Sequence, residues 1–164
     1  MDSFICRQTG SHGYNAEEIG RRVEKMLKRV ESQFIMPSVN LFCQSGNMNQ
    51  YAAKFCKLCG FHPVFKMSQS KLSLIGVRGG KLENAWRRFI RWHLLRKRRI
   101  STDVIFISHV GCTVEQQDFI RHEVLRCIPF KKIIMQRASV TLACNSGIGT
   151  FGLAYYVNAS KKDF

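Results

Sequence analysis

The stretch with the clearest chemical content is CNSGIGTFGLAYYV, residues 144–157, close to the C-terminal end of the chain. Gly147 and Gly149 permit turns in which successive backbone N–H groups converge on an anion. Ser146 and Thr150 add two hydroxyl donors beside those glycines. The pattern fits two structures, a plain turn before a strand or a cradle for a carboxylate or phosphate. In the second case, the apolar residues that follow would line a neighbouring apolar pocket.

Two other segments carry residues that could do chemistry. CKLCGFH, residues 56–62, contains a C-x-x-C pair, but the sequence shows no second pair of zinc ligands. Cys56 and Cys59 fall late in an expected helix on its apolar side, so we interpret them as core residues. Redox or metal chemistry at this pair is a third hypothesis. His109 ends a buried strand, where ligands of open α/β sheets bind, and either ligand binding or a structural role fits it.

The charge of the chain is strongly positive. It has 26 Lys+Arg and 11 Asp+Glu residues, a formal net charge of +15, which favours anionic partners. Residues 87–99, RRFIRWHLLRKRR, hold seven basic residues and no acidic one: Arg87, Arg88, Arg91, Arg96, Lys97, Arg98 and Arg99. This segment is either a solvated helix face or a surface that docks an acidic protein or a membrane. Nucleic acid is disfavoured as a partner, because no RNP or zinc-finger signature is present.

Hydrophobic periodicity and capping signals predict the elements that would position these residues. We expect helices that begin at Asn15, near residue 48, after residues 79–80 and at Thr113, the first and last with capping pairs. We expect strands in QFIMPSVNLF (33–42), PVFKM (63–67), KLSLIGV (71–77), DVIFISH (103–109), KIIMQ (132–136), SVTLAC (139–144) and TFGLAYYV (150–157). The order of these elements predicts an α/β layered fold with a mixed β-sheet packed with helices.

Length and composition indicate the class of protein. A chain of 164 residues with 45% hydrophobic residues has the size of one domain with a substantial core. Its seven cysteines are an odd number inside mostly apolar runs, which predicts reduced, buried thiols. The sequence has no apolar run of transmembrane length, and its first residues do not read as a secretory signal. We therefore expect a cytoplasmic protein.

The order of three segments resembles the C-terminal lobe of the DegV family. KLSLIGVRGGKLENAWRRFIRWHLL, DVIFISHVG and ASVTLACNSGIGTFGLAYYV follow one another as the family's GK-x-R helix entry, ISHA strand and GTHTGPGALGLAFY run do. NLFCQSGNMNQYAAKFCKLCGFHPVF is similar to an earlier family segment, with matching positions at Gly46, Gly60 and Pro63. MDSF resembles the end of the family's first lobe. The resemblance implies that residues 1–14 are a remnant of that lobe and that residues 15–164 form the C-terminal lobe.

The resemblance also implies a ligand and a binding mode. Proteins of this family bind a long-chain fatty acid between two lobes, and some present it to a fatty-acid kinase. The carboxylate is held at the closing Gly-rich turn, and the acyl chain runs through an apolar tunnel. The chain departs from the family at Asn145 and Asn47, which replace a histidine and an arginine, and at Ile148, which replaces a proline. Most of the first lobe is also absent.

We therefore hypothesise a non-catalytic lipid-binding module. Its head-group residues would be Asn145, Ser146, Gly147, Gly149 and Thr150, with Asn47 nearby. The alternative is a ligand-free regulatory domain that docks an acidic partner through residues 87–99. We expect no enzyme activity, cofactor or metal, because the sequence shows no nucleophile–base pair, metal cluster or phosphate loop. Self-association is a further expectation, because a lone lobe would expose its inter-lobe surface.

Overall fold

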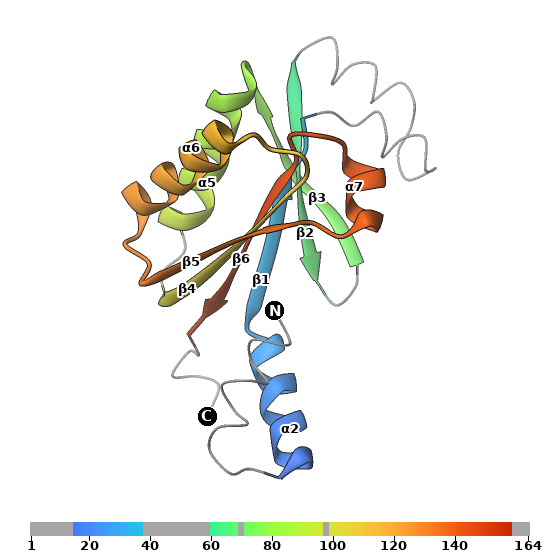
Figure 1. Ribbon diagram of the computed structural model, residues 1–164, viewed down its shortest axis with the longest axis vertical. Coiled ribbons are helices and arrows are strands. Elements are labelled where there is room, and N and C mark those ends of the chain that lie inside the picture. Colours follow the sequence, from blue (N-terminus) through green and yellow to red (C-terminus); the bar gives the residue numbers. More distant parts are fainter. Residues whose placement is uncertain (1–14, 38–59, 69–70, 97–98, 159–164) are drawn as a thin grey trace.

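A computed structural model describes residues 15–37, 60–68, 71–96 and 99–158. These residues form a six-stranded sheet with the strand order β3-β2-β1-β6-β4-β5 (Figure 1). The strands are β1 (Val30–Ile35), β2 (Phe61–Ser68), β3 (Lys71–Gly79), β4 (Ile100–His109), β5 (Lys132–Arg137) and β6 (Phe151–Val157). The helices are α2 (Ala16–Leu27), α5 (Leu82–Arg96), α6 (Val114–Cys127) and α7 (Val140–Ser146).

The sheet is mixed, as the sequence predicted. β4 and β5 run parallel and are connected through α6, while the other neighbouring strands are antiparallel. β4 lies between β5 and β6, which explains the continuous apolar run of residues 104–107. β2 and β3 form the predicted hairpin, with a register shift after Val64. The predicted α/β fold class is therefore confirmed.

The predicted helix starts are confirmed by their caps. The Asn15 side chain accepts hydrogen bonds from the backbone of α2, and Glu18 completes the capping box. Thr113 and Gln116 form the same arrangement at the start of α6. Each box satisfies backbone N–H groups that have no partner within the helix.

One face of the sheet is covered by α5 and α6, and we call it the helix face (Figure 1). Ile105, Leu153 and Tyr155 point from the sheet into this core and are almost fully buried. Trp86 of α5 is also fully buried and meets the ring of Phe151 edge to face, at 5.4 Å between centroids. Burial of these large side chains supplies the main apolar stabilisation of the layer.

The predicted strand at residues 139–144 is wrong, because this segment forms helix α7. Ser139 acts as its N-cap, and its side chain accepts a hydrogen bond from Leu142 N. Leu142 then packs against Phe34, Met36 and Phe65, a small apolar cluster on the side of the sheet opposite α5 and α6. The cap and this tertiary contact override the strand propensity of Val140 and Thr141.

Several predicted features lie outside the described residues. They are the segment 1–14, the helix expected over about 48–59, Asn47, Cys56, Cys59, Lys97 and Arg98. In the part of the chain that is described, none of the helices has the length and apolar character needed to cross a membrane.

Candidate functional site

The face of the sheet opposite the helix face carries an apolar groove of about 430 Å³. This volume lies in the range of ~300–1,000 Å³ that is typical of small-molecule sites. Apolar walls come from strands β1, β2 and β3 and from α7, and small residues of β6 form the floor. The lining residues are Ser32, Phe34, Met36, Met67, Leu72, Ser108, Ser139, Thr141, Leu142, Asn145, Gly152 and Ala154.

The floor of the groove follows from the alternation of side chains along β6. Phe151, Leu153 and Tyr155 fill the helix face, whereas Gly152 and Ala154 point into the groove. A Cβ at position 152 would lie 3.0 Å from the Cβ of Phe34 and 3.1 Å from Gln33 O, so glycine favours this close approach of β1 and β6. On the groove side, the small residues of β6 therefore leave an open space. On the helix face, the large side chains of the same strand fill the core.

The Gly-rich turn connects α7 to β6 at one end of this groove. Gly147 and Gly149 have φ values of 80° and 89°, a region that favours glycine, as the sequence predicted for this turn. The turn is fastened to the end of β4 by two backbone hydrogen bonds, from Gly149 N to Val110 O and from Val110 N to Thr150 O, both 2.8 Å. The turn therefore fixes where α7 lies relative to the sheet.

Most donors of this turn already have hydrogen-bond partners in the protein. The Ser146 hydroxyl donates to Leu142 O at 2.6 Å, and the Thr150 hydroxyl donates to Ser146 O at 2.8 Å. The backbone N–H groups of Gly147, Gly149 and Thr150 donate to carbonyl oxygens as well. Ser146 and Thr150 are almost fully buried and do not line the groove.

Among the described residues of the predicted head-group set, Asn145 is the one that lines the groove. Its Nδ2 donates to Thr141 O at 2.7 Å, which leaves a second amide hydrogen for a ligand. On the floor nearby, the Ser108 hydroxyl accepts a hydrogen bond from Gln136 Nε2 at 2.9 Å and can still donate its own proton. The structure thus brings an amide and a hydroxyl to the rim and floor of an apolar space.

His109 stands at the end of β4, as predicted, but its side chain points away from the groove. It pairs with Phe151 and shares that residue's face of the sheet, while the neighbouring Ser108–Gly152 pair faces the groove. His109 is buried, and this burial, with a smaller contribution from Arg137, lowers its pKa. Any interaction of His109 with a molecule in the groove would have to be indirect.

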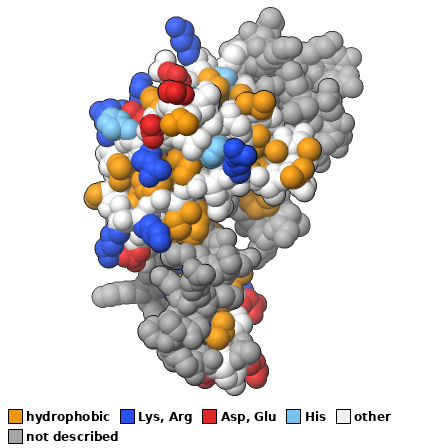
Figure 2. Space-filling model, in the orientation of Figure 1, with side chains coloured by type: hydrophobic (Ala, Val, Ile, Leu, Met, Phe, Trp, Pro, Cys, Tyr) orange, Lys and Arg blue, Asp and Glu red, His pale blue; other side chains and the backbone are white. Residues whose placement is uncertain are grey.

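A second distinctive surface lies on the outer side of α5. A hollow of about 380 Å³ is lined by Arg78 of β3 together with Arg87, Arg88, Arg91 and Trp92 of α5. The guanidinium carbons of Arg78 and Arg96 lie 5.0 Å and 4.7 Å from the Trp92 ring centroid, within cation–π range. Figure 2 shows basic side chains among hydrophobic ones over the region that α5 and α6 form.

This arginine surface is short of negative charge. Arg87 forms an ion pair with Glu123 at 3.2 Å, but none of the described carboxylates pairs with Arg78, Arg88 or Arg91. Burial and the neighbouring Arg88 lower the pKa of Arg78. Arg96 and Arg99 are exposed nearby in the sequence, so five of the seven predicted basic residues, Arg87, Arg88, Arg91, Arg96 and Arg99, lie in the described part of the chain.

Within the described ranges, the titratable groups near the turn do not form a nucleophile–base pair. Burial raises the pKa of the Cys112 thiol to about 11, so the thiol stays protonated at neutral pH. Its sulfur lies 4.0 Å from Thr150 O. Among the described residues no cluster of His, Cys, Asp and Glu could hold a metal ion.

Reasoning from the sequence missed most residues that form the groove. Its walls come from β1, β2 and β3, far from the Gly-rich turn in the sequence. One signal was available, because FGLAYYV alternates large residues with Gly152 and Ala154. Such an alternation in a central strand indicates that one face has room for another molecule.

Comparison with known proteins identifies a matching family and solved structures with a similar fold. The profile of the DegV family of uncharacterised proteins matches residues 6–158. A DegV family protein from Eubacterium eligens, loaded with heptadecanoic acid, superimposes with a TM-score of 0.80 at 16% identity, over 96% of this chain and 56% of that one. The fatty acid kinase B3 protein of Streptococcus pneumoniae, loaded with linoleic acid, gives a TM-score of 0.78 at 13% identity, over 93% and 53%.

A fatty-acid-binding DegV family protein from Thermus thermophilus superimposes with a TM-score of 0.71 at 15% identity, over 96% of this chain and 56% of that one. The chain thus spans little more than half the length of these three structures. No curated protein sequence matches the chain. The family profile covers almost the whole of the described fold, including the groove and the Gly-rich turn. The chain belongs to the DegV family.

Proposed function

We propose that this protein is a non-catalytic lipid-binding module that holds a long-chain fatty acid in the groove. The observation that carries the proposal is the groove itself, an apolar space of about 430 Å³ with a few polar groups at its edge. That composition is typical of sites for amphipathic ligands. The related structures loaded with heptadecanoic and linoleic acid support this class of ligand.

The acyl chain would supply most of the affinity. Phe34, Met36, Leu142, Met67 and Leu72 offer apolar side chains along the walls. Each methylene that leaves water contributes about 0.8 kcal/mol. A chain that buries eight methylenes would therefore gain about 6 kcal/mol before the losses of binding entropy are subtracted.

The carboxylate would lie at the Gly-rich turn, as the resemblance to the DegV family implies. Asn145 presents an amide hydrogen at this end, and Ser108 presents a hydroxyl on the groove floor. Ser146, Gly147, Gly149 and Thr150 would act through the shape of the turn, and Asn47 would be a further neighbour. Neutral donors give weaker hydrogen bonds to a carboxylate than charged ones, so we expect the head group mainly to set the orientation of the ligand.

The first experiment is native mass spectrometry of the protein purified from cells, followed by organic extraction and lipid analysis. A stoichiometric fatty acid supports the proposal. Asn145→Ala should then lower the occupancy, whereas Asn84→Ala, an exposed asparagine on α5, should not. The proposal is abandoned if the purified protein is empty and also fails to take up added fatty acid.

A second candidate function is docking of an acidic protein surface by the arginine residues around Trp92. The hollow lined by four arginines, three of them without an acidic partner among the described residues, favours it. Carboxylates match the planar guanidinium group, and a fatty-acid kinase is one partner of this kind, by analogy with the kinase B3 protein.

The dependence of binding affinity on salt concentration distinguishes the two proposed functions. Binding of an acidic partner through Arg78 and Arg91 should weaken steeply with ionic strength, while burial of an acyl chain should not. The double substitution Arg78→Glu and Arg91→Glu should abolish binding of the acidic partner and leave fatty-acid binding unchanged. Arg121→Glu, an exposed arginine on α6, is the matched control. Acidic-partner binding that survives the double substitution would exclude this surface.

A further inference from the structure

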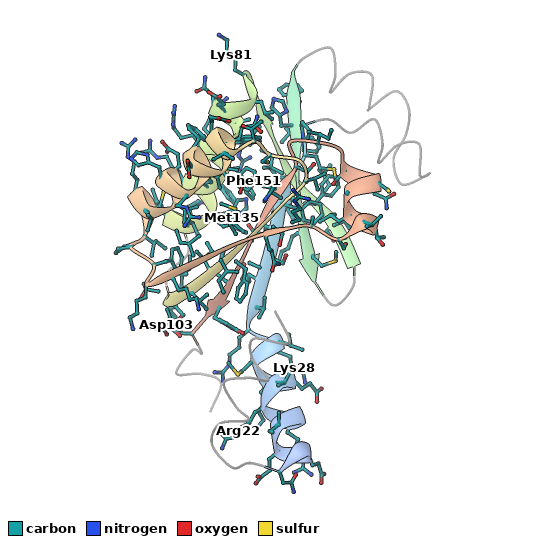
Figure 3. The ribbon with its side chains drawn as sticks, in the orientation of Figure 1. Arg22, Lys28, Lys81, Asp103, Met135 and Phe151 are labelled. Atoms are coloured by element: carbon teal, nitrogen blue, oxygen red, sulfur yellow. The ribbon has the colours of Figure 1, made fainter. Side chains whose placement is uncertain are left out.

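His62 of β2 is buried and contacts two backbone carbonyl groups with its two ring nitrogens. Its Nδ1 lies 2.8 Å from Pro37 O, and its Nε2 lies 2.9 Å from Gly80 O. Pro37 comes just after β1, and Gly80 stands between β3 and α5. Figure 3 shows Lys81, the residue after Gly80, at the end of the molecule opposite Lys28 of α2. One imidazole ring therefore links three separate segments at this end of the sheet.

The two contacts require two donors. A carbonyl oxygen only accepts hydrogen bonds, and a neutral imidazole carries a single N–H group. In the neutral form, one nitrogen of His62 would face a carbonyl oxygen at 2.8 or 2.9 Å with lone pairs on both atoms. The imidazolium form has two N–H groups and satisfies both carbonyls with charge-assisted hydrogen bonds. The geometry therefore matches the charged ring.

The charged groups around His62 oppose this positive charge. Arg78 of β3 pairs with His62 in the sheet, and the Arg88 guanidinium donates to Gly79 O. The charged form of the ring is thus stabilised by its two carbonyl partners and destabilised by burial and by the two arginines. The remaining charged side chains on β2 and at the start of α5 are Lys66, Lys81 and Glu83. Histidine side chains change charge between about pH 5 and pH 8, so the number of donors on the ring depends on pH in this range.

The segments that His62 holds lie beside the Gly-rich turn. A Cβ added to Gly149 would lie 3.7 Å from Pro37 Cγ and 3.6 Å from Leu82 Cδ2, so both side chains adjoin the turn. Pro37 also follows Met36, which forms part of the groove wall. Leu82 is the first residue of α5. The hydrogen bonds of His62 therefore fix side chains that support the turn and one wall of the groove.

We propose, on the basis of the function proposed above, that His62 is a positioning residue and acts as a pH-dependent latch at this end of the groove. At acidic pH the imidazolium donates to both carbonyl groups and holds Pro37 and Gly80 in place beside the Gly-rich turn. As the pH rises, the ring loses a proton and with it one of the two hydrogen bonds. The support of the turn then weakens, and a bound fatty acid is held less tightly.

The first test is an NMR titration of the full chain from about pH 5 to about pH 8. Both N–H protons of the His62 ring should be visible at the acidic end, because hydrogen bonds to carbonyl groups slow their exchange with water. The backbone amide signals of Gly149 and Thr150 should move with the same midpoint as the ring. His62→Gln should abolish this movement, while His122→Gln, the same change at an exposed histidine of α6, should not.

Two NMR results would overturn the inference. One is a His62 ring that shows a single N–H proton throughout the titration. The other is a movement of the Gly149 signal that has a different midpoint or persists in the folded His62→Gln variant. The first result needs no substitution, so the test does not depend on how well the variant folds.

The second test compares the affinities of the wild type and His62→Gln for hexadecanoic acid by isothermal titration calorimetry. Ionisation of the fatty acid affects both proteins equally and cancels in the ratio of their affinities. The wild type should bind about fivefold more tightly than the variant at about pH 6 and about equally at about pH 8. A ratio that does not change with pH would refute the link between the latch and the groove. If neither protein binds the acid, the proposed lipid-binding function fails, while the NMR titration still decides whether His62 supports the turn.

Discussion

Ser32→Leu tests the groove directly, because Ser32 lines it from β1 and takes no part in the Gly-rich turn. Ser32 is half-buried on β1 and is paired with Ala154 on one side and Met67 on the other. A leucine adds two heavy atoms net, which would displace about two methylenes of a bound chain. At about 0.8 kcal/mol for each methylene, the loss is about 1.6 kcal/mol, or roughly 15-fold in affinity.

The assay is displacement of a fluorescent fatty acid, and Ser73→Leu provides the matched control. Ser73 is exposed on β3 and pairs with Lys66, which points to the face opposite Met67 and the groove. This control makes the same chemical change outside the groove and should leave the affinity unchanged. Urea unfolding verifies that both variants fold. Equal affinities for folded Ser32→Leu and the wild type would refute the proposal that the chain lies in this groove.

Three further predictions concern the scaffold of the site. Trp86→Ala removes a fully buried ring that packs on Phe151 and should lower the free energy of unfolding by about 3–5 kcal/mol in urea denaturation. Ser139→Ala removes the N-cap of α7 and should cost about 1 kcal/mol in the same assay, with Ser73→Ala as an exposed control. Burial, reinforced by Arg78 and Lys66, lowers the pKa of His93 to about 4. The unfolded state therefore binds a proton near pH 6.5 that the folded state refuses, so stability falls as the pH drops from about 6.5 to about 4. His93→Leu should flatten this fall in thermal melts, and an unchanged slope would show that His93 is not its source.

Much of the fold could be predicted because local signals and burial agree. The capping pairs at Asn15 and Thr113 determine where α2 and α6 begin, and both starts are confirmed. The apolar run of β4 predicted a strand inside the sheet, and the structure confirms it with a strand on each side. In each case short-range chemistry and tertiary packing favour the same conformation.

α7 shows where such reasoning fails. Val140 and Thr141 are β-branched, and they favour a strand when only the sequence is considered. β4 and β1 already flank β6, so this segment cannot pair with the strand that follows it. Ser139 starts a helix instead, and Leu142 reaches the apolar cluster of Phe34 and Phe65. That contact joins residues more than 70 positions apart, so no local pattern could reveal it.

The Gly-rich turn beside the proposed site was predictable from the sequence, whereas the walls of the groove were not. The Gly-rich turn stands beside the groove, and its glycines have the positive φ values that the sequence implied. The groove walls, however, depend on how β1, β2 and β3 are ordered in the sheet, which residue spacing does not determine. Only the alternation of Gly152 and Ala154 with large residues in β6 pointed to them.

The hydrogen bonds of the turn give its residues a physical role that does not require direct contact with a ligand. The Thr150 hydroxyl ties the start of β6 to the end of α7, the Ser146 hydroxyl bonds back to Leu142 O within α7, and Gly149 ties the turn to the end of β4. These bonds fix α7 beside the groove, so that Leu142 forms a wall and Asn145 lies at the rim. Under the proposed function, recognition of a head group at this end would therefore depend on neutral donors such as the Asn145 amide.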